Sequence, residues 1–260
     1  MKPLPPAGRV FEFWFQYPSV PPVVCVWTER DWNGPHCFAA FVSYHQSSPA
    51  GGAEPFDFLT TMLSTIVGLT GWQDGSITFR GKQIGGRRTH GVGRRTPGIV
   101  RNGISLAPQG DAIFPGLSVK DNLDSGAYSG ASWRSRRTRR DHVLDIFPPL
   151  RSLLRQTAGT LSGGERRMVS VGRALMGDAK LYLVDEPSLG LAPKISIGLV
   201  SALCEIDLGD GAMIIAEQNL PLLEGRVDRV LGMHAGELKL DVGEALGDIP
   251  PATGGVGAWG

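Results

Sequence analysis

Two adjacent carboxylates, Asp185 and Glu186, follow the apolar run LYLV at residues 181–184. A short apolar run of this kind predicts a buried strand, and parallel strands of α/β proteins present the residues at their carboxyl ends to the crevice where ligands bind. Asp185 could hold Mg²⁺ there, because Mg²⁺ takes oxygen ligands and keeps several waters. Glu186 could orient and deprotonate an attacking water. The alternative is that the pair only ends a strand before a turn at Pro187.

A pair of glycines precedes the carboxylates, in the stretch TLSGGERRMVSVGRAL. Gly163 and Gly164 allow the backbone to approach a ligand closely, and the helix predicted over 164–177 offers free N–H groups and the positive end of its dipole. Ser162 and Glu165 have S-x-x-E spacing, which predicts a capping box. A capped helix after two glycines is common by itself, but together with the carboxylate pair it indicates a phosphate ligand.

The combined stretch LSGGERRMVSVGRALMGDAKLYLVDEPSLGLAP resembles the signature motif and the Walker B motif of ATP-binding cassette (ABC) proteins. The resemblance implies that two subunits enclose two ATP molecules between them. Ser162, Gly163 and Gly164 would then touch the γ-phosphate of the ATP that the partner subunit holds. Asp185 would support Mg²⁺, and Glu186 would be the general base for ATP hydrolysis.

Further positions match other motifs of the family. Gln109, in APQGDAIFPGLSVKDNL, falls at the Q-loop glutamine, which implies that it reaches toward Mg²⁺ and toward the membrane subunit of a transporter. Thr60 and Thr61 match the Ser/Thr pair of the ATP-binding loop, which implies contacts to Mg²⁺ and to phosphate. Gln218 stands where most cassette ATPases have a histidine that contacts the γ-phosphate, and its amide cannot act as a charged donor.

The stretches APQGDAIFPGLSVKDNL, DEPSLGLAPKI and IIAEQNL resemble the ATPases of branched-chain amino-acid importers of the LivF type and their urea-importer relatives. This implies an ATP-hydrolysing subunit that energises uptake of branched-chain amino acids or a similar small polar solute. The implied partners are a second cassette subunit, membrane permease subunits and, indirectly, a solute-binding protein. The implied location is cytoplasmic, on the inner face of the cell membrane and held there by the permease.

Composition favours no other class of partner. The 26 basic and 25 acidic residues give a net charge of +1, so no overall field favours nucleic acid. No run of about 18 apolar residues predicts a membrane span. Cassette ATPases of DNA repair or translation usually carry a coiled-coil insertion or tandem cassettes, and neither is found in these 260 residues.

The resemblance predicts an α/β fold similar to P-loop NTPases, over residues 60–245. We expect a mostly parallel core sheet, a helical subdomain at about 110–165 and a flexible tail at 246–260. The basic run RSRRTRR at 134–140 predicts a solvated helix face, within a helical pattern at 138–146. Strands are predicted at 76–81, 103–109, 180–186, 212–218 and 228–233, the last continuing into a hairpin through 238–243.

Residues 1–59 differ from the rest, with nine of the nineteen prolines and no clear periodicity, which predicts an anomalous or poorly ordered segment. The chain contains no G-x-x-x-x-G-K-[ST], and Phe58 and Leu59 stand where the Gly and Lys of that loop belong. We therefore predict weak ATP binding. One hypothesis is that a frame change or a wrong start has replaced the family's N-terminal sequence. The alternative is a non-catalytic subunit that only supplies its signature face to a partner ATPase.

Overall fold

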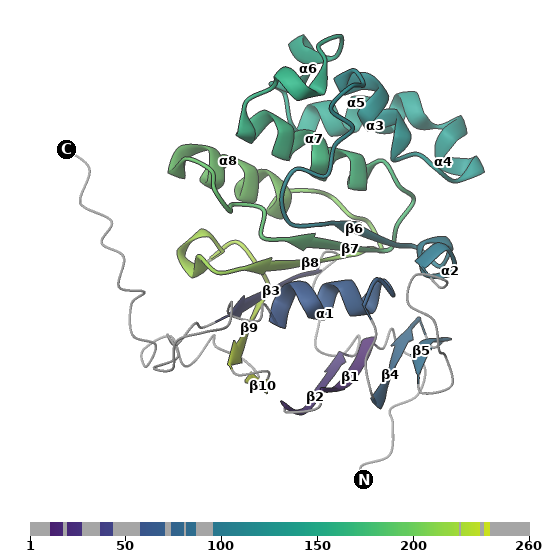
Figure 1. Cartoon of the computed structure of the whole chain (residues 1–260), viewed down its shortest axis with the longest axis vertical. Coiled ribbons are helices and arrows are strands. Elements are labelled where there is room, and N and C mark those ends of the chain that lie inside the picture. Colours follow the sequence, from purple (N-terminus) through teal and green to yellow (C-terminus); the bar gives the residue numbers. More distant parts are fainter. Residues whose placement is uncertain are drawn as a thin grey trace, which may run out of the picture.

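The computed structural model describes the chain in nine ranges, and side chains are described for most of the residues in them. The strands form two sheets, and helices pack on both sides of the larger sheet (Figure 1). The described ranges are 11–17, 20–27, 37–43, 58–70, 74–80, 82–86, 96–223, 225–234 and 237–239.

The larger sheet has six strands in the order β10-β9-β3-β8-β7-β6. Four of its pairings, β3 with β8 and with β9, β7 with β8, and β6 with β7, are parallel. Its last pairing, β9 with β10, is antiparallel and confirms the predicted hairpin as far as Lys239. The strands are β3 (Cys37–Ser43), β6 (Ile104–Ala107), β7 (Leu181–Asp185), β8 (Ala212–Glu217), β9 (Arg229–His234) and β10 (Glu237–Lys239). The predicted parallel core sheet is thus confirmed.

The smaller sheet is antiparallel and has the order β2-β1-β4-β5. Its strands are β1 (Phe11–Tyr17), β2 (Val20–Trp27), β4 (Asp74–Phe79) and β5 (Lys82–Gly86). β4 agrees with the strand predicted at 76–81. Strands β1, β2 and β3 come from residues 1–59, and most of the other residues of that segment lie outside the described ranges, as does the predicted tail at 246–260.

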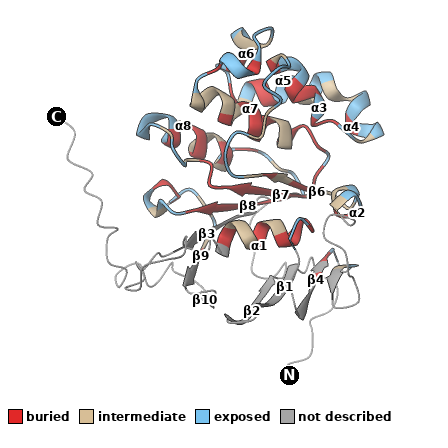
Figure 2. Ribbon diagram, viewed as in Figure 1, coloured by how far each residue is buried: buried red, intermediate tan, exposed pale blue. Residues whose placement is uncertain are grey.

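Each face of the core sheet is covered by helices (Figures 1 and 2). Helix α1 (Phe58–Ile66) packs against one face, where Leu181 and Leu183 of β7 point. Helices α7 (Gly163–Leu175) and α8 (Pro193–Cys204) pack with Tyr182 and Val184 on the opposite face. All five residues of β7 are buried because the strand lies between these two layers.

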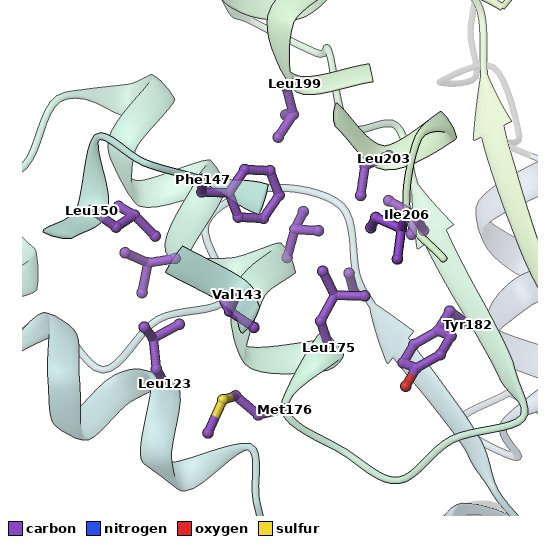
Figure 3. Packing of buried hydrophobic residues seen from close by; sticks show 14 of the residues in the cluster. Leu123, Val143, Phe147, Leu150, Leu175, Met176, Tyr182, Leu199, Leu203 and Ile206 are labelled. Carbon is purple, nitrogen blue, oxygen red and sulfur yellow. The ribbon is translucent and has the colours of Figure 1, made fainter. Parts of the chain in front are cut away.

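Short helices lie beyond α7, on the side of it away from the sheet (Figure 1). Apolar side chains of three of them, α3, α5 and α6, form one buried cluster with those of α7 and α8, which Figure 3 shows in part. Gly172 of α7 lets the helices approach, because a Cβ there would lie 2.8 Å from Val143 and 3.0 Å from Leu123. These helices are α3 (Val119–Ser125), α4 (Gly130–Arg134), α5 (Arg136–Ile146) and α6 (Leu150–Leu153), while α2 (Thr96–Arg101) precedes β6.

Helices α5 and α7 match the helical patterns predicted at 138–146 and 164–177. Of the arginines at the start of α5, Arg137 is exposed and the other three are only partly exposed. Arg139 donates to Gly177 O and pairs with Asp178, and Arg140 pairs with Asp124. Arg136 lies over the ring of Trp133. Within the described residues, no helix has the length and apolar character that crossing a membrane requires.

Candidate functional site

Asp185 is the last residue of β7 and Glu186 follows it directly, so both carboxylates stand at the carboxyl end of that strand. Both residues are buried, with 2% and 1% of their surface exposed. Glu186 has a φ of +43°, a left-handed backbone conformation that costs a residue other than glycine about 1 to 2 kcal/mol. Its N–H donates to Ala216 O of β8 at 2.8 Å, which ties this strained residue to the neighbouring strand. Strain of this kind is concentrated at functional sites.

Helix α1 brings a hydroxyl to the carboxylate of Asp185. Thr60 Oγ1 donates to Asp185 Oδ1 at 3.0 Å, although the two residues are far apart in the sequence. Thr61 is the next residue of the same helical turn, and its carbonyl accepts a hydrogen bond from Thr65 Oγ1 at 2.7 Å. The start of α1 therefore places Thr60 at the end of β7, beside the first of the two carboxylates.

Two side-chain amides meet on the carboxylate of Glu186. Gln109 lies just after β6, and its Nε2 donates to Glu186 Oε2 at 2.7 Å. Gln218 lies just after β8, and its Nε2 donates to Glu186 Oε1. Both glutamines are exposed residues, so the buried carboxylate is held at the edge of the sheet from its solvent side. The structure thus brings together Thr60, Gln109, Asp185, Glu186 and Gln218.

A buried glutamate fixes the segment that carries Gln218. Glu217 is 3% exposed and its carboxylate accepts hydrogen bonds from the backbone N–H groups of Gln218 at 3.0 Å and Asn219 at 3.1 Å. It also accepts the N–H of Ser188 at 3.3 Å, so it joins the end of β8 to the loop after β7. Sequence reasoning did not select this residue, and the only signal for it was its position at the end of a buried strand.

The glycine turn at the start of α7 has the predicted capping box. Ser162 N donates to Glu165 Oε2 at 2.8 Å, and Glu165 N donates to Ser162 Oγ at 3.4 Å. A Cβ on Gly164 would lie 2.8 Å from a methyl carbon of Ile195, so the missing side chain lets this turn lie against the start of α8. Ser162 is exposed, and Gly163 and Gly164 are partly exposed, which leaves the N-terminus of α7 accessible.

Arg167, one turn into α7, joins the loops around the carboxylates and was not predicted as a site residue. It is 2% exposed. Its guanidinium donates to the carbonyl oxygens of Pro108 at 2.8 Å, Glu186 at 2.7 Å and Pro187 at 3.3 Å, and also to those of Gly110 and Asp185. Burial lowers the pKa of Arg167, and the nearby negative charges of Asp185 and other carboxylates oppose that shift.

The oxygen atoms of Asp185 and Thr60 fit a Mg²⁺ ion. Mg²⁺ is usually bound in proteins through one or two carboxylates together with substrate phosphates and water, and a carboxylate beside a hydroxyl is a donor set of this type. Within the described residues there is no group of three or more His, Cys, Asp or Glu that could hold a metal without other ligands. A single carboxylate beside a hydroxyl agrees with a metal that arrives with a phosphate ligand.

A parallel sheet with carboxylates at the end of β7, together with a capped glycine turn, is typical of the class of α/β proteins that bind phosphate-bearing ligands. Residues 60–189 match the sequence model of a family described as "ABC transporter". The chain belongs to this family as an ATP-binding subunit, and the family hydrolyses ATP.

Several relatives are named as transport or import ATP-binding proteins. The high-affinity branched-chain amino acid transport ATP-binding protein BraG of Pseudomonas aeruginosa is 34% identical over 188 residues, which cover 72% of this chain and 77% of BraG. The probable branched-chain amino acid transport ATP-binding protein LivF of Archaeoglobus fulgidus is 36% identical over 53% of this chain and 55% of its own length. The phosphonates import ATP-binding protein PhnC of Chromohalobacter salexigens is 34% identical over 58% of each chain. The matched part thus spans little more than half of two of these relatives.

Solved structures of the same class have the same fold. A subunit of the ABC transporter complex cbiONQ from Clostridium perfringens aligns with a TM-score of 0.68 at 18% identity, over 93% of this chain and 92% of its own. The ADP conformation of another ATP-binding cassette aligns with a TM-score of 0.67 at 18% identity, over 90% of both chains. The predicted fold class and family are confirmed.

Proposed function

We propose that the chain is the ATP-hydrolysing subunit of an importer for branched-chain amino acids or a similar small polar solute. The observation that carries this proposal is the carboxylate of Glu186, which accepts hydrogen bonds from Gln109 and Gln218 beside the Thr60–Asp185 pair. The names of BraG and LivF support the branched-chain solute class. PhnC, named for phosphonates, shows that similar sequences serve other solutes.

The residues of the site have distinct roles in this proposal. Asp185 and Thr60, with Gln109, would hold Mg²⁺, which supplies positive charge against the phosphates when it is bound. Glu186 accepts the proton of the attacking water, because its carboxylate lies at the end of β7 next to the metal-binding residues. Gln109 and Gln218 orient that carboxylate by donating to one oxygen each. Gln218 brings no charge to the γ-phosphate, unlike a protonated histidine.

The glycine turn serves a second nucleotide in this proposal. Ser162, Gly163 and Gly164 offer an accessible helix N-terminus, which binds anions through its free N–H groups and its dipole. We assign this turn to the γ-phosphate of an ATP held by a second cassette subunit. Thr61 contacts phosphate within its own subunit. Permease subunits would hold the pair at the cytoplasmic face of the membrane, with a solute-binding protein delivering the solute.

ATP turnover tests the proposed role of Glu186. We expect Glu186→Gln to lower turnover by about 10² to 10⁴ at millimolar ATP, because a positioned general base contributes that much. The matched control is Glu205→Gln, which changes an exposed glutamate at the end of α8 and should leave the rate unchanged. The assay is made on the chain alone and on the chain mixed with a cassette partner.

Two results would contradict the proposal. Turnover in the mixture that survives Glu186→Gln would show that the partner's site does the chemistry and that this chain only supplies its signature face.

Reconstitution with permease subunits in vesicles tests the solute, by comparing uptake of leucine, urea and a phosphonate. Uptake of the phosphonate alone would overturn the assignment to branched-chain amino acids.

A further inference from the structure

Arg167 is a buried cation that contacts both loops of the Glu186 site. It donates to Pro108 O and Gly110 O, which lie on either side of Gln109. It also donates to three consecutive carbonyl oxygens, those of Asp185, Glu186 and Pro187. A guanidinium suits this task, because it presents five N–H donors in a rigid plane, whereas a lysine ammonium presents three on a flexible stem.

Both loops need such a support. The backbone of Glu186 is in the left-handed region, and Gly110 also has a positive φ, of +76°. The hydrogen bond from Gln109 to Glu186 is 2.7 Å long, and it would be lost if the two loops moved apart by about 1 Å. Arg167 is anchored on α7, a helix of thirteen residues packed in the core. It can therefore hold the two loops in one fixed relation to each other.

Arg167 is a buried charge surrounded by carboxylates, because a guanidinium is not deprotonated in proteins. Asp185, Glu186 and Glu217 are each at most 3% exposed and each attracts the guanidinium, as does Asp111. The neighbouring Arg166 adds a contact at the surface, since its Nε lies 2.6 Å from Asp111 Oδ2 in the same loop as Gln109. Two successive arginines of α7 therefore hold this loop.

We propose that Arg167 is a positioning residue, which holds the loops of Gln109 and Glu186 together so that the amide of the first orients the carboxylate of the second. This inference rests on the roles proposed above for those two residues. The arrangement also makes the geometry of the carboxylate depend on α7, whose N-terminus is the glycine turn. A shift of that helix would move all five carbonyl contacts at once.

Amide hydrogen exchange of the full chain without nucleotide tests the proposal, with Arg167→Gln as the variant. We expect peptides covering 108–115 and 186–191 to exchange about tenfold faster, while peptides from α8 change only as the overall stability does. The control is Arg139→Gln, because Arg139 is a partly buried arginine that donates to Gly177 O and Asp178, far from the two loops in the sequence. It should destabilise the chain without opening the two loops selectively.

Other patterns of hydrogen exchange would contradict the proposal, and a second variant covers the case in which Arg167→Gln does not fold. Faster exchange everywhere, in the pattern of the Arg139 control, or no change in either loop would overturn it. If Arg167→Gln does not fold, Arg167→Lys replaces it. Selective opening in the lysine variant supports the proposal. Exchange like the wild type would show that charge alone suffices, and loss of folding would show a general core role, so both would overturn it.

Turnover gives a separate measurement where the chain hydrolyses ATP. Arg167→Gln should lower kcat and leave KM for ATP within about twofold, because it misplaces the base and not the nucleotide. A raised KM with unchanged kcat would contradict the positioning role. If no ATP is hydrolysed at all, the proposed function fails, but the exchange measurement still decides the role of Arg167.

Discussion

Replacing Asn122 by alanine should destabilise the chain strongly. Asn122 is fully buried in α3, and its side chain closes the segment that follows the Gln109 loop. Its Oδ1 accepts the N–H of Phe114 at 2.7 Å, and its Nδ2 donates to Phe114 O and Ser118 O at 3.0 Å each. Sequence reasoning gave this residue no role.

The expected magnitude follows from these contacts. Each of the three hydrogen bonds contributes about 0.5 to 1.5 kcal/mol, and leaving a buried partner unsatisfied costs about 1 to 3 kcal/mol. The side chain of Phe114 is half exposed, so water can replace part of what is lost. We therefore expect Asn122→Ala to lower the free energy of unfolding by about 2 to 4 kcal/mol.

Urea denaturation followed by circular dichroism measures this change. The matched control is Asn219→Ala, at an exposed asparagine, for which we expect a change within about 0.5 kcal/mol. Asn122→Asp keeps the acceptor for Phe114 N but places a carboxylate against two carbonyl oxygens, and it should be at least as destabilising as the alanine variant. If Asn122→Ala and Asn219→Ala unfold at the same urea concentration, the hydrogen bonds do not stabilise the fold as argued.

Three further predictions concern packing, reactivity and affinity. Gly172→Ala should lower the free energy of unfolding by about 1 to 3 kcal/mol, measured by denaturation, because its methyl group would press on Val143 and Leu123. Burial raises the pKa of the Cys204 thiol from 9.0 to about 11. Its thiolate fraction at pH 8 is therefore about 0.1%, and mass spectrometry should find its peptide almost unmodified by iodoacetamide at that pH. The folded thiol stays protonated up to a higher pH than the unfolded thiol. The stability that this difference contributes is present below pH 9 and is lost as the pH rises toward 11. We also predict that ATP binds only at about millimolar concentration, because the loss of three or four hydrogen bonds to phosphate would cost more than about 5 kcal/mol; a micromolar Kd in a nucleotide titration would refute this.

Local sequence signals predicted the parts of the fold that are built locally. The apolar runs of β6, β7 and β8 and the capping box of α7 depend on neighbours within a few residues. The hydrogen bond between Thr60 and Asp185 does not depend on neighbouring residues, because 125 positions separate the two in the sequence. Only the resemblance to a known family could predict that contact, since no periodicity of the chain encodes it.

Arg167 and Glu217 were missed for a related reason. Arg167 belongs to a charged stretch that follows two glycines, and such a stretch is usually a solvated helix face. It is buried because carbonyl groups of two distant loops converge on it. The same holds for Glu217, which accepts N–H groups from its own segment and from Ser188. Hydrogen bonds that join separate loops leave no pattern in one sequence.

Strand β3 determines when the core sheet can be completed during synthesis. It lies between β8 and β9, with Cys37 opposite Ala212 and Ala39 opposite Arg229. Because synthesis proceeds from the N-terminus, β3 is made before the other strands of the core sheet. It cannot pair with β8 and β9 until almost the whole ATPase domain has left the ribosome. Pairings between such distant segments form slowly, and an unpaired edge invites aggregation. A nascent chain that stops before β8 would therefore expose the edge of β7. The need for chaperones should last until the end of translation, when β8 and β9 become available.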